Sequence, residues 1–167
     1  PNDPGFTLTL WVNPYQPGNG QQMLAGKNVY SRGQREWGVM IDDDGVFRLY
    51  LRQDGWKTIT AAKKPKAGHW YQVGVVIRPG EAELWVNGKK TGALTLSKPI
   101  SRTTAPLTLG GIDDGGRIRQ TFLGAIDELH YLDRPLSAKE LAARYQPHDA
   151  TLAIPEPPVR FSLWKKS

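Results

Sequence analysis

The segment at residues 30–37, YSRGQREW, gathers two aromatic side chains, two arginines and a glutamate. Sugar rings present apolar C–H faces that stack on Trp and Tyr, while their hydroxyl groups need polar partners. An arginine fork can bridge two vicinal hydroxyl groups, a carboxylate or a sulfate. The candidate contacts to a saccharide are therefore Tyr30, Arg32, Arg35 and Trp37. The alternative interpretation is an ordinary charged hairpin edge.

Trp56 and the segment at residues 112–119 have a similar composition. Trp56 follows an Asp-Gly turn and stands among charged and polar neighbours, so it has no evident core partner and is a further candidate for stacking. The segment 112–119, IDDGGRIR, carries both signs of charge and has glycines that would let it reach outward. Its candidate polar contacts are Asp113, Asp114 and Arg117.

The carboxylates do not form a convincing catalytic pair. Glycoside hydrolysis needs two carboxylates that face one cleft. Asp127 and Glu128 are adjacent, and adjacent side chains of a strand point to opposite faces. The sequence has no Cys, and its three His residues lack the spacing of a zinc site. We therefore expect no enzyme activity from this chain itself.

Calcium fits the acidic turns better than zinc does, because it takes oxygen ligands from carboxylates and backbone carbonyls. Residues 42–44 and 113–114 are such turns. The alternative is that these Asp residues simply favour turn geometry.

Charge and hydropathy argue against a nucleic-acid partner and against a membrane-spanning segment. The 167 residues include 22 Lys and Arg against 16 Asp and Glu, a net charge of +6. The basic residues are scattered in ones and twos, which argues against a nucleic-acid-binding arm. The positive bias slightly favours an acidic partner, such as an acidic polysaccharide. No apolar stretch approaches the ~20 residues that span a bilayer.

Short β-rich segments recur about every ten residues with turn residues between them, which predicts an all-β, two-sheet antiparallel jelly-roll sandwich. Asp-Gly at residues 44–45 and Asn-Gly at 87–88 predict hairpins. One short helix is predicted at 137–145, where Ser137 and Glu140 form a capping box. Residues 147–167 form a Pro-rich tail, in which the alternating segment 159–164 is a possible further strand.

Five segments, in the correct order, resemble the laminin-G-like and concanavalin A-like jelly rolls. Their family wordings are FTISAWVKP, GxWxHVA, LYVNGK, LxIGG and FxGxIDEVRIYNRALS. The corresponding segments of this chain are 6–14, 68–75, 83–89, 107–111 and 122–137. The resemblance implies one jelly-roll domain at residues 1–146.

The resemblance also implies roles for single residues. Trp11 and Trp70 fall in core strand motifs, and Trp85 is expected to be buried or half-buried. Many relatives hold a structural calcium near the IDE strand, which nominates Asp127 as a metal ligand. The family's opening strand has no counterpart before residue 6. Either this sequence lacks that strand, or residues 159–164 take its place at the edge of the sandwich.

The resemblance implies a non-catalytic carbohydrate-binding module. Such modules are appended to secreted bacterial enzymes, chiefly glycoside hydrolases, and hold the attached enzyme near its polysaccharide. A secreted, periplasmic or cell-surface location follows from that interpretation. The alternatives are a protein-binding or adhesion domain, or a scaffold packed against a catalytic neighbour. A hydrolase in its own right is the least favoured hypothesis.

Overall fold

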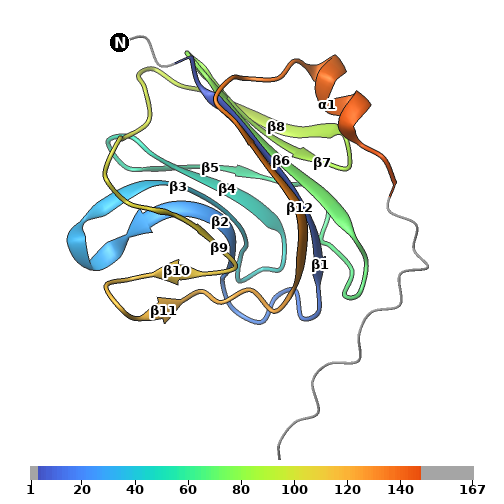
Figure 1. The fold of residues 1–167 in the computed structure, drawn as a ribbon, viewed down its shortest axis with the longest axis horizontal. Coiled ribbons are helices and arrows are strands. Elements are labelled where there is room, and N and C mark those ends of the chain that lie inside the picture. The colour runs from blue at the N-terminus through green and yellow to red at the C-terminus, as the bar shows by residue number, and fades with distance from the viewer. Residues whose placement is uncertain (1–3, 148–167) are drawn as a thin grey trace, which may run out of the picture.

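The computed structural model describes residues 4–147. They form two five-stranded antiparallel sheets packed face to face, with one short helix outside them (Figure 1). This arrangement confirms the predicted jelly-roll sandwich. The possible strand at 159–164 lies outside the described residues, and so does most of the Pro-rich tail.

The first sheet has the strand order β12-β1-β6-β7-β8. Its strands are β1 (Phe6–Pro14), β6 (Tyr71–Arg78), β7 (Glu81–Val86), β8 (Lys89–Thr95) and β12 (Gly124–Leu132). The predicted Asn-Gly turn joins β7 to β8, and Asn87 has a positive φ of 51°, as a tight hairpin turn of this kind requires.

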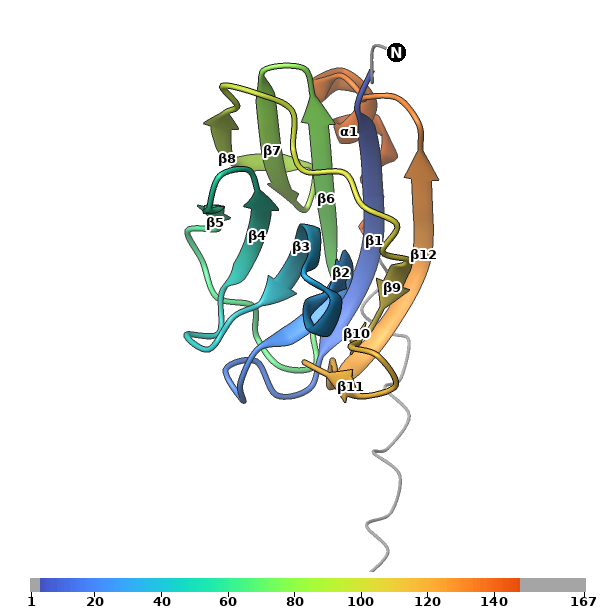
Figure 2. The same cartoon turned by 90° about the vertical axis from the view of Figure 1, so that its left-hand side faces the viewer.

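The second sheet has the order β5-β4-β3-β2-β9. Its strands are β2 (Gln22–Val29), β3 (Gln34–Ile41), β4 (Phe47–Arg52), β5 (Trp56–Thr60) and β9 (Leu107–Leu109). A single 3-10 turn, η1 (Tyr30–Arg32), connects β2 to β3. The small ribbon of β10 (Ile112–Asp113) and β11 (Ile118–Arg119) lies beside the β2 and β9 end of this sheet (Figure 2).

The core lies between the two sheets and takes alternate residues from each strand, as the pleat of a strand requires. From β1 it takes Phe6, Leu8, Leu10 and Val12, and from β3 and β4 it takes Trp37, Val39, Ile41, Phe47, Leu49 and Leu51. All of these side chains are at most 1% exposed. The residues between the core positions of β3 and β4 therefore face outward.

The helix α1 (Ala138–Arg144) packs against the outer face of the first sheet. Its Leu141 joins Leu136 over Val76 and Trp85, which is buried as predicted. The capping box is present, because Ser137 Oγ accepts from the Glu140 N–H and the Glu140 carboxylate accepts from the Ser137 N–H. The predicted helix is thereby confirmed.

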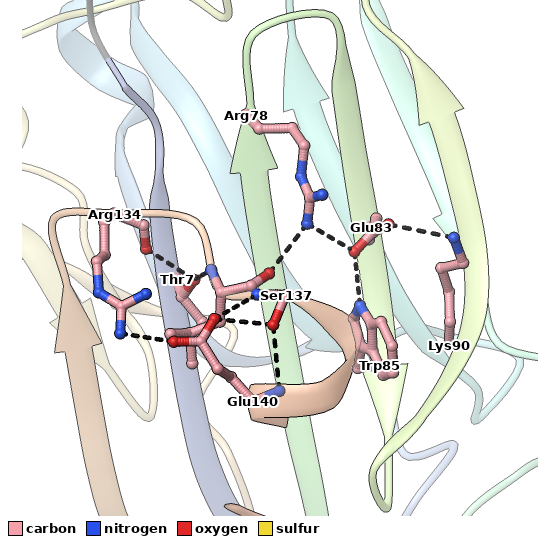
Figure 3. A network of polar contacts seen from close by, with 9 residues as sticks. Thr7, Arg78, Glu83, Trp85, Lys90, Arg134, Ser137 and Glu140 are labelled. Atoms are coloured by element: carbon pink, nitrogen blue, oxygen red, sulfur yellow. Dashed lines mark hydrogen bonds and ion pairs between the residues drawn. The ribbon is translucent and has the colours of Figure 1, made fainter. Parts of the chain in front are cut away.

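A polar network surrounds this helix (Figure 3). The buried Glu83 carboxylate accepts hydrogen bonds from Trp85 Nε1 at 2.9 Å, Arg78 at 3.2 Å and Lys90 at 3.2 Å. Arg78 also donates to the Leu136 carbonyl oxygen, 3.1 Å away. Glu83 is thus a buried charge with two cations, and the network secures the helix to the sheet. No helix within residues 4–147 has the length and apolar character needed to cross a membrane.

Candidate functional site

A hollow of about 440 Å³ lies on the outer face of the second sheet. Side chains of β2, β3 and β4 line it, together with Trp56 of β5, Tyr30 of η1, and the flanking residues Gln21 and Gln120. Its position follows from the alternation of the strands, since the opposite face of the same sheet packs into the core.

Two methionines and a glycine form the floor of the hollow. Met23 and Met40 are buried and pack together. Gly38 lies beneath the Met23 side chain, and a Cβ atom at position 38 would come within 2.8 Å of Met23 Cε. The missing side chain therefore lets Met23 lie flat on the sheet. The result is a closely packed apolar base beneath the hollow.

Tyr30 and Arg35 form one wall. The Arg35 guanidinium carbon lies 5.4 Å from the centre of the Tyr30 ring, within the range of a cation–π interaction. The Tyr30 hydroxyl donates to Gln120 Oε1 at 3.4 Å, and Gln120 in turn donates to Gln21 Oε1 at 2.6 Å. Burial of the ring is the main cause that raises the pKa of Tyr30 above its ordinary value.

Tyr50 and Trp56 form the opposite wall. Their rings meet edge to face, with centroids 5.9 Å apart. The Trp56 side chain remains 38% exposed, and the Arg52 guanidinium lies 5.8 Å from the centre of its ring. An aromatic–arginine pair therefore stands on each side of the hollow.

Asp42 lies behind the Tyr50 wall and fixes it in place. Its carboxylate accepts hydrogen bonds from the Tyr50 hydroxyl, Arg48 and Gln21 Nε2. Burial opposes its ionisation, but these hydrogen bonds and the Arg48 charge outweigh that effect, and the pKa of Asp42 is lowered. Burial, followed by the bond to Asp42, raises the pKa of Tyr50.

A bulge in β3 aims Arg35 at the hollow. Lys27 pairs with Trp37 and Asn28 pairs with Arg35, so Glu36 is an extra residue opposite this step. The buried Asn28 side chain satisfies the displaced backbone, because it donates to the Trp37 carbonyl oxygen at 2.7 Å and accepts from the Glu36 N–H at 3.2 Å.

A family model described as the concanavalin A-like lectin/glucanases superfamily matches residues 2–142. The chain belongs to this superfamily. No curated protein matches this concanavalin A-like domain in sequence.

Solved structures resemble the concanavalin A-like domain in fold. The Ruminococcus gnavus IT-sialidase CBM40 bound to α2,3-sialyllactose is 20% identical, with a TM-score of 0.73, and 87% of this chain aligns with 84% of that one. Domain 4 of AbnA, a GH43 extracellular arabinanase from Geobacillus stearothermophilus in complex with arabinotriose, is 20% identical with a TM-score of 0.67. In this comparison 87% of this chain aligns with 68% of the arabinanase domain. A pentraxin from Limulus polyphemus is 18% identical with a TM-score of 0.64, and 85% of this chain aligns with 70% of the pentraxin chain. At these identities the likeness shows the fold alone.

Three of the predicted contacts line the hollow of this concanavalin A-like domain: Tyr30, Arg35 and Trp56. The prediction for Trp37 is wrong, because its indole is fully buried in the core and packs against Phe6 at a centroid distance of 5.1 Å. Arg32 is exposed on η1 and does not line the hollow.

The predicted contacts of the β10–β11 ribbon lie beside the hollow and not on its lining. Asp114 is buried and binds the Ser31 N–H at 2.5 Å and Arg119 Nε at 2.8 Å. The Ser31 N–H bond comes first among the causes that lower the pKa of Asp114. Asp114 therefore ties the ribbon to η1, while Asp113 and Arg117 are exposed on the ribbon.

The sequence did not point to the other seven lining residues of the hollow. The missed lining residues are Gln21, Met23, Asn28, Gly38, Met40, Tyr50 and Gln120. Alternation with core residues was an available signal for Met40 and Tyr50, since both stand between apolar neighbours on their strands.

The described residues 4–147 contain no group of three or more acidic or His side chains that could hold a metal ion. Asp127 is exposed on the edge strand β12, and its Oδ1 accepts a hydrogen bond from the Glu128 N–H at 2.8 Å. The calcium site at Asp127 stays a prediction.

Proposed function

We propose that this domain binds carbohydrate non-catalytically in the hollow on its second sheet. One observation supports the proposal above all: an open hollow lies over two buried methionines, with the stacked Tyr30–Arg35 pair and the exposed Trp56 ring in its lining. The aromatic rings would contact the C–H faces of a sugar, and the amide and guanidinium groups would receive its hydroxyls.

The volume of the hollow, about 440 Å³, fits one or two sugar rings and lies in the usual range of small-ligand sites, about 300–1,000 Å³. Two of the similar structures, the CBM40 of the IT-sialidase and domain 4 of the arabinanase, hold sialyllactose and arabinotriose. Those ligands support a saccharide as the class of ligand for this domain.

We further propose that the domain serves an attached enzyme, outside the cell or at its surface. By binding a polysaccharide it would raise the local concentration of the enzyme at its substrate. The Pro-rich residues 154–158 have the composition of a linker to such a neighbour.

A protein-binding role is the second candidate, and exposed apolar side chains favour it. Leu107 and Leu109 on β9 are 38% and 45% exposed, and Ile118 on β11 is 68% exposed. These side chains lie outside the hollow, so the two functions can be separated by mutation.

Binding to an array of plant, microbial and animal glycans tests the first proposal. We expect the wild type to retain at least one glycan and Trp56→Ala to lose it, because the exposed indole supplies a stacking wall. Leu107→Ala is the matched control, since Leu107 has the same exposed fraction of 38% and lies outside the hollow. Equal retention by both variants and the wild type would exclude the hollow as the site.

A further inference from the structure

The charges around the hollow are unevenly distributed. Arg35 is the one charged side chain that lines it, and no carboxylate does so among residues 4–147. Asp42, which lies behind the Tyr50 wall, already accepts hydrogen bonds from three side chains and is paired with Arg48. The lining therefore offers a ligand a positive charge and no negative one.

Among residues 4–147 Arg35 has no acidic partner, unlike five other arginines of the sandwich. Within the described part of the chain, no Asp or Glu oxygen lies within 4.0 Å of its guanidinium. The arginines that do have such a partner are Arg48, Arg78, Arg102, Arg119 and Arg134. A protein-internal ion pair does not occupy the Arg35 charge, so a ligand can use it.

The Arg35 guanidinium is nevertheless held in place. It packs over the Tyr30 ring, and Tyr30 is itself held by its hydrogen bond to Gln120. Stacking engages the face of a guanidinium and leaves its in-plane N–H donors directed outward. Two parallel N–H donors match the two oxygens of a carboxylate, and such bidentate pairs are among the strongest hydrogen-bonded contacts.

Arg52 adds a second cation next to the lining residue Trp56. It packs over Trp56, and like Arg35 it forms no ion pair with a carboxylate in residues 4–147. The lining rings Tyr30 and Trp56 thus each carry a stacked arginine without an acidic partner among residues 4–147. A neutral saccharide would leave this positive field unused.

We infer that the hollow takes an acidic saccharide and that Arg35 receives the carboxylate of one sugar residue. The inference rests on the proposed function and names its class of ligand. The sugar ring lies in the hollow, Trp56 stacks on it or on its neighbour, and Arg35 binds the carboxylate in a bidentate pair.

Matched saccharides that differ only at the carboxyl group test this inference. The probes are sialyllactose, trigalacturonate and a hyaluronan tetrasaccharide, each compared by calorimetry with its methyl-esterified or carboxyl-reduced form. We expect at least one acid to bind about tenfold or more tighter than its neutral form, because charge-assisted hydrogen bonds exceed neutral ones by that amount. Equal affinity for acid and neutral forms would overturn the inference.

Arg35→Gln and Arg32→Gln form a matched pair of variants. Each removes one positive charge, but only Arg35 lines the hollow. We expect Arg35→Gln to lose about tenfold or more in affinity for the acid and little for a neutral form, while Arg32→Gln stays close to the wild type. Equal losses in both variants would show general charge attraction instead and overturn the inference.

The same experiment separates failure of the inference from failure of the proposed function. One outcome is binding of neutral glycans that is lost in Trp56→Ala and kept in Arg35→Gln. This outcome would support carbohydrate binding in the hollow and exclude the acidic ligand. Binding of sulfated, carboxyl-reduced heparin in preference to every carboxylate would likewise exclude it. If no probe and no glycan on the array is retained, both proposals fail. Thermal unfolding of each variant verifies that it is folded.

Discussion

Arg35 and Trp37 stand two residues apart on β3 and face opposite sides of the sheet. Arg35 lines the outer hollow, whereas Trp37 is fully buried in the core. In a regular strand, residues i and i+2 share a face. The extra residue Glu36 at the bulge reverses this relationship, and it thereby separates a side chain that lines the hollow from a core side chain.

This relationship predicts different effects of mutation at the two positions. Trp37→Ala should lower the free energy of unfolding by about 3–5 kcal/mol, because it removes a large aromatic ring from a packed core. Arg35→Gln should change it little, since Arg35 has no ion-pair partner among the described residues to lose. Urea denaturation followed by circular dichroism measures both. A stable Trp37→Ala variant would contradict the core position of this indole.

The glycine at position 38 predicts a change in binding without loss of the fold. In Gly38→Ala the new Cβ would meet the end of the flexible Met23 side chain, which can move into the hollow. We expect weaker glycan binding with a melting temperature near that of the wild type.

Gly26→Ala is the control for that variant. Gly26 pairs with Gly38 across β2 and β3, but its Cβ would lie 2.9 Å from the Trp37 carbonyl oxygen, an atom of the backbone. We expect this variant to be clearly less stable than Gly38→Ala. Melting temperatures in the reverse order would contradict the packing described for the floor.

The cap of α1 predicts a dependence of stability on pH. The hydrogen bond from Arg134, followed by those from the Ser137 N–H and hydroxyl, lowers the pKa of Glu140 to about 2. Because the folded pKa lies below the unfolded value of about 4.3, the ionised group stabilises the folded state above that value. This contribution is lost as the pH falls from about 4.3 towards 2.

Glu140→Gln measures that contribution. We expect the variant to be less stable than the wild type at pH 7, and the difference to shrink as the pH falls through this window. Urea denaturation at pH 7, 4 and 3 provides the comparison. A difference that stays constant with pH would show that the Glu140 charge does not stabilise the cap.

Removal of metal ions should leave glycan binding intact. No carboxylate lines the hollow within residues 4–147, so the proposed contacts need no cation. Asp127 is on β12 in the opposite sheet. We expect a chelator to leave glycan affinity unchanged, whereas calcium at Asp127 would appear as a rise in melting temperature that Asp127→Asn abolishes. Loss of glycan binding with the chelator would contradict the metal-independent contacts.

The sequence by itself determined the sandwich, because local patterns specify local structure. The segment at residues 6–14, which resembles a family strand motif, predicted β1, Asn-Gly predicted the β7–β8 hairpin, and Ser137 with Glu140 predicted the start of α1. It also identified Tyr30, Arg35 and Trp56 by their types and polar neighbours.

Only the tertiary structure decided which face of the second sheet became the core and which became the hollow. Met40 and Tyr50 alternate with core residues, but alternation alone does not say that residues as distant as Gln21 and Gln120 meet beside them. The bulge at Glu36 depends on the register of β3 against β2, which the residues of β3 alone do not set. For that reason the sequence wrongly predicted Trp37 to face the ligand. The face that a side chain takes is set by the register of its strand against the neighbouring strands.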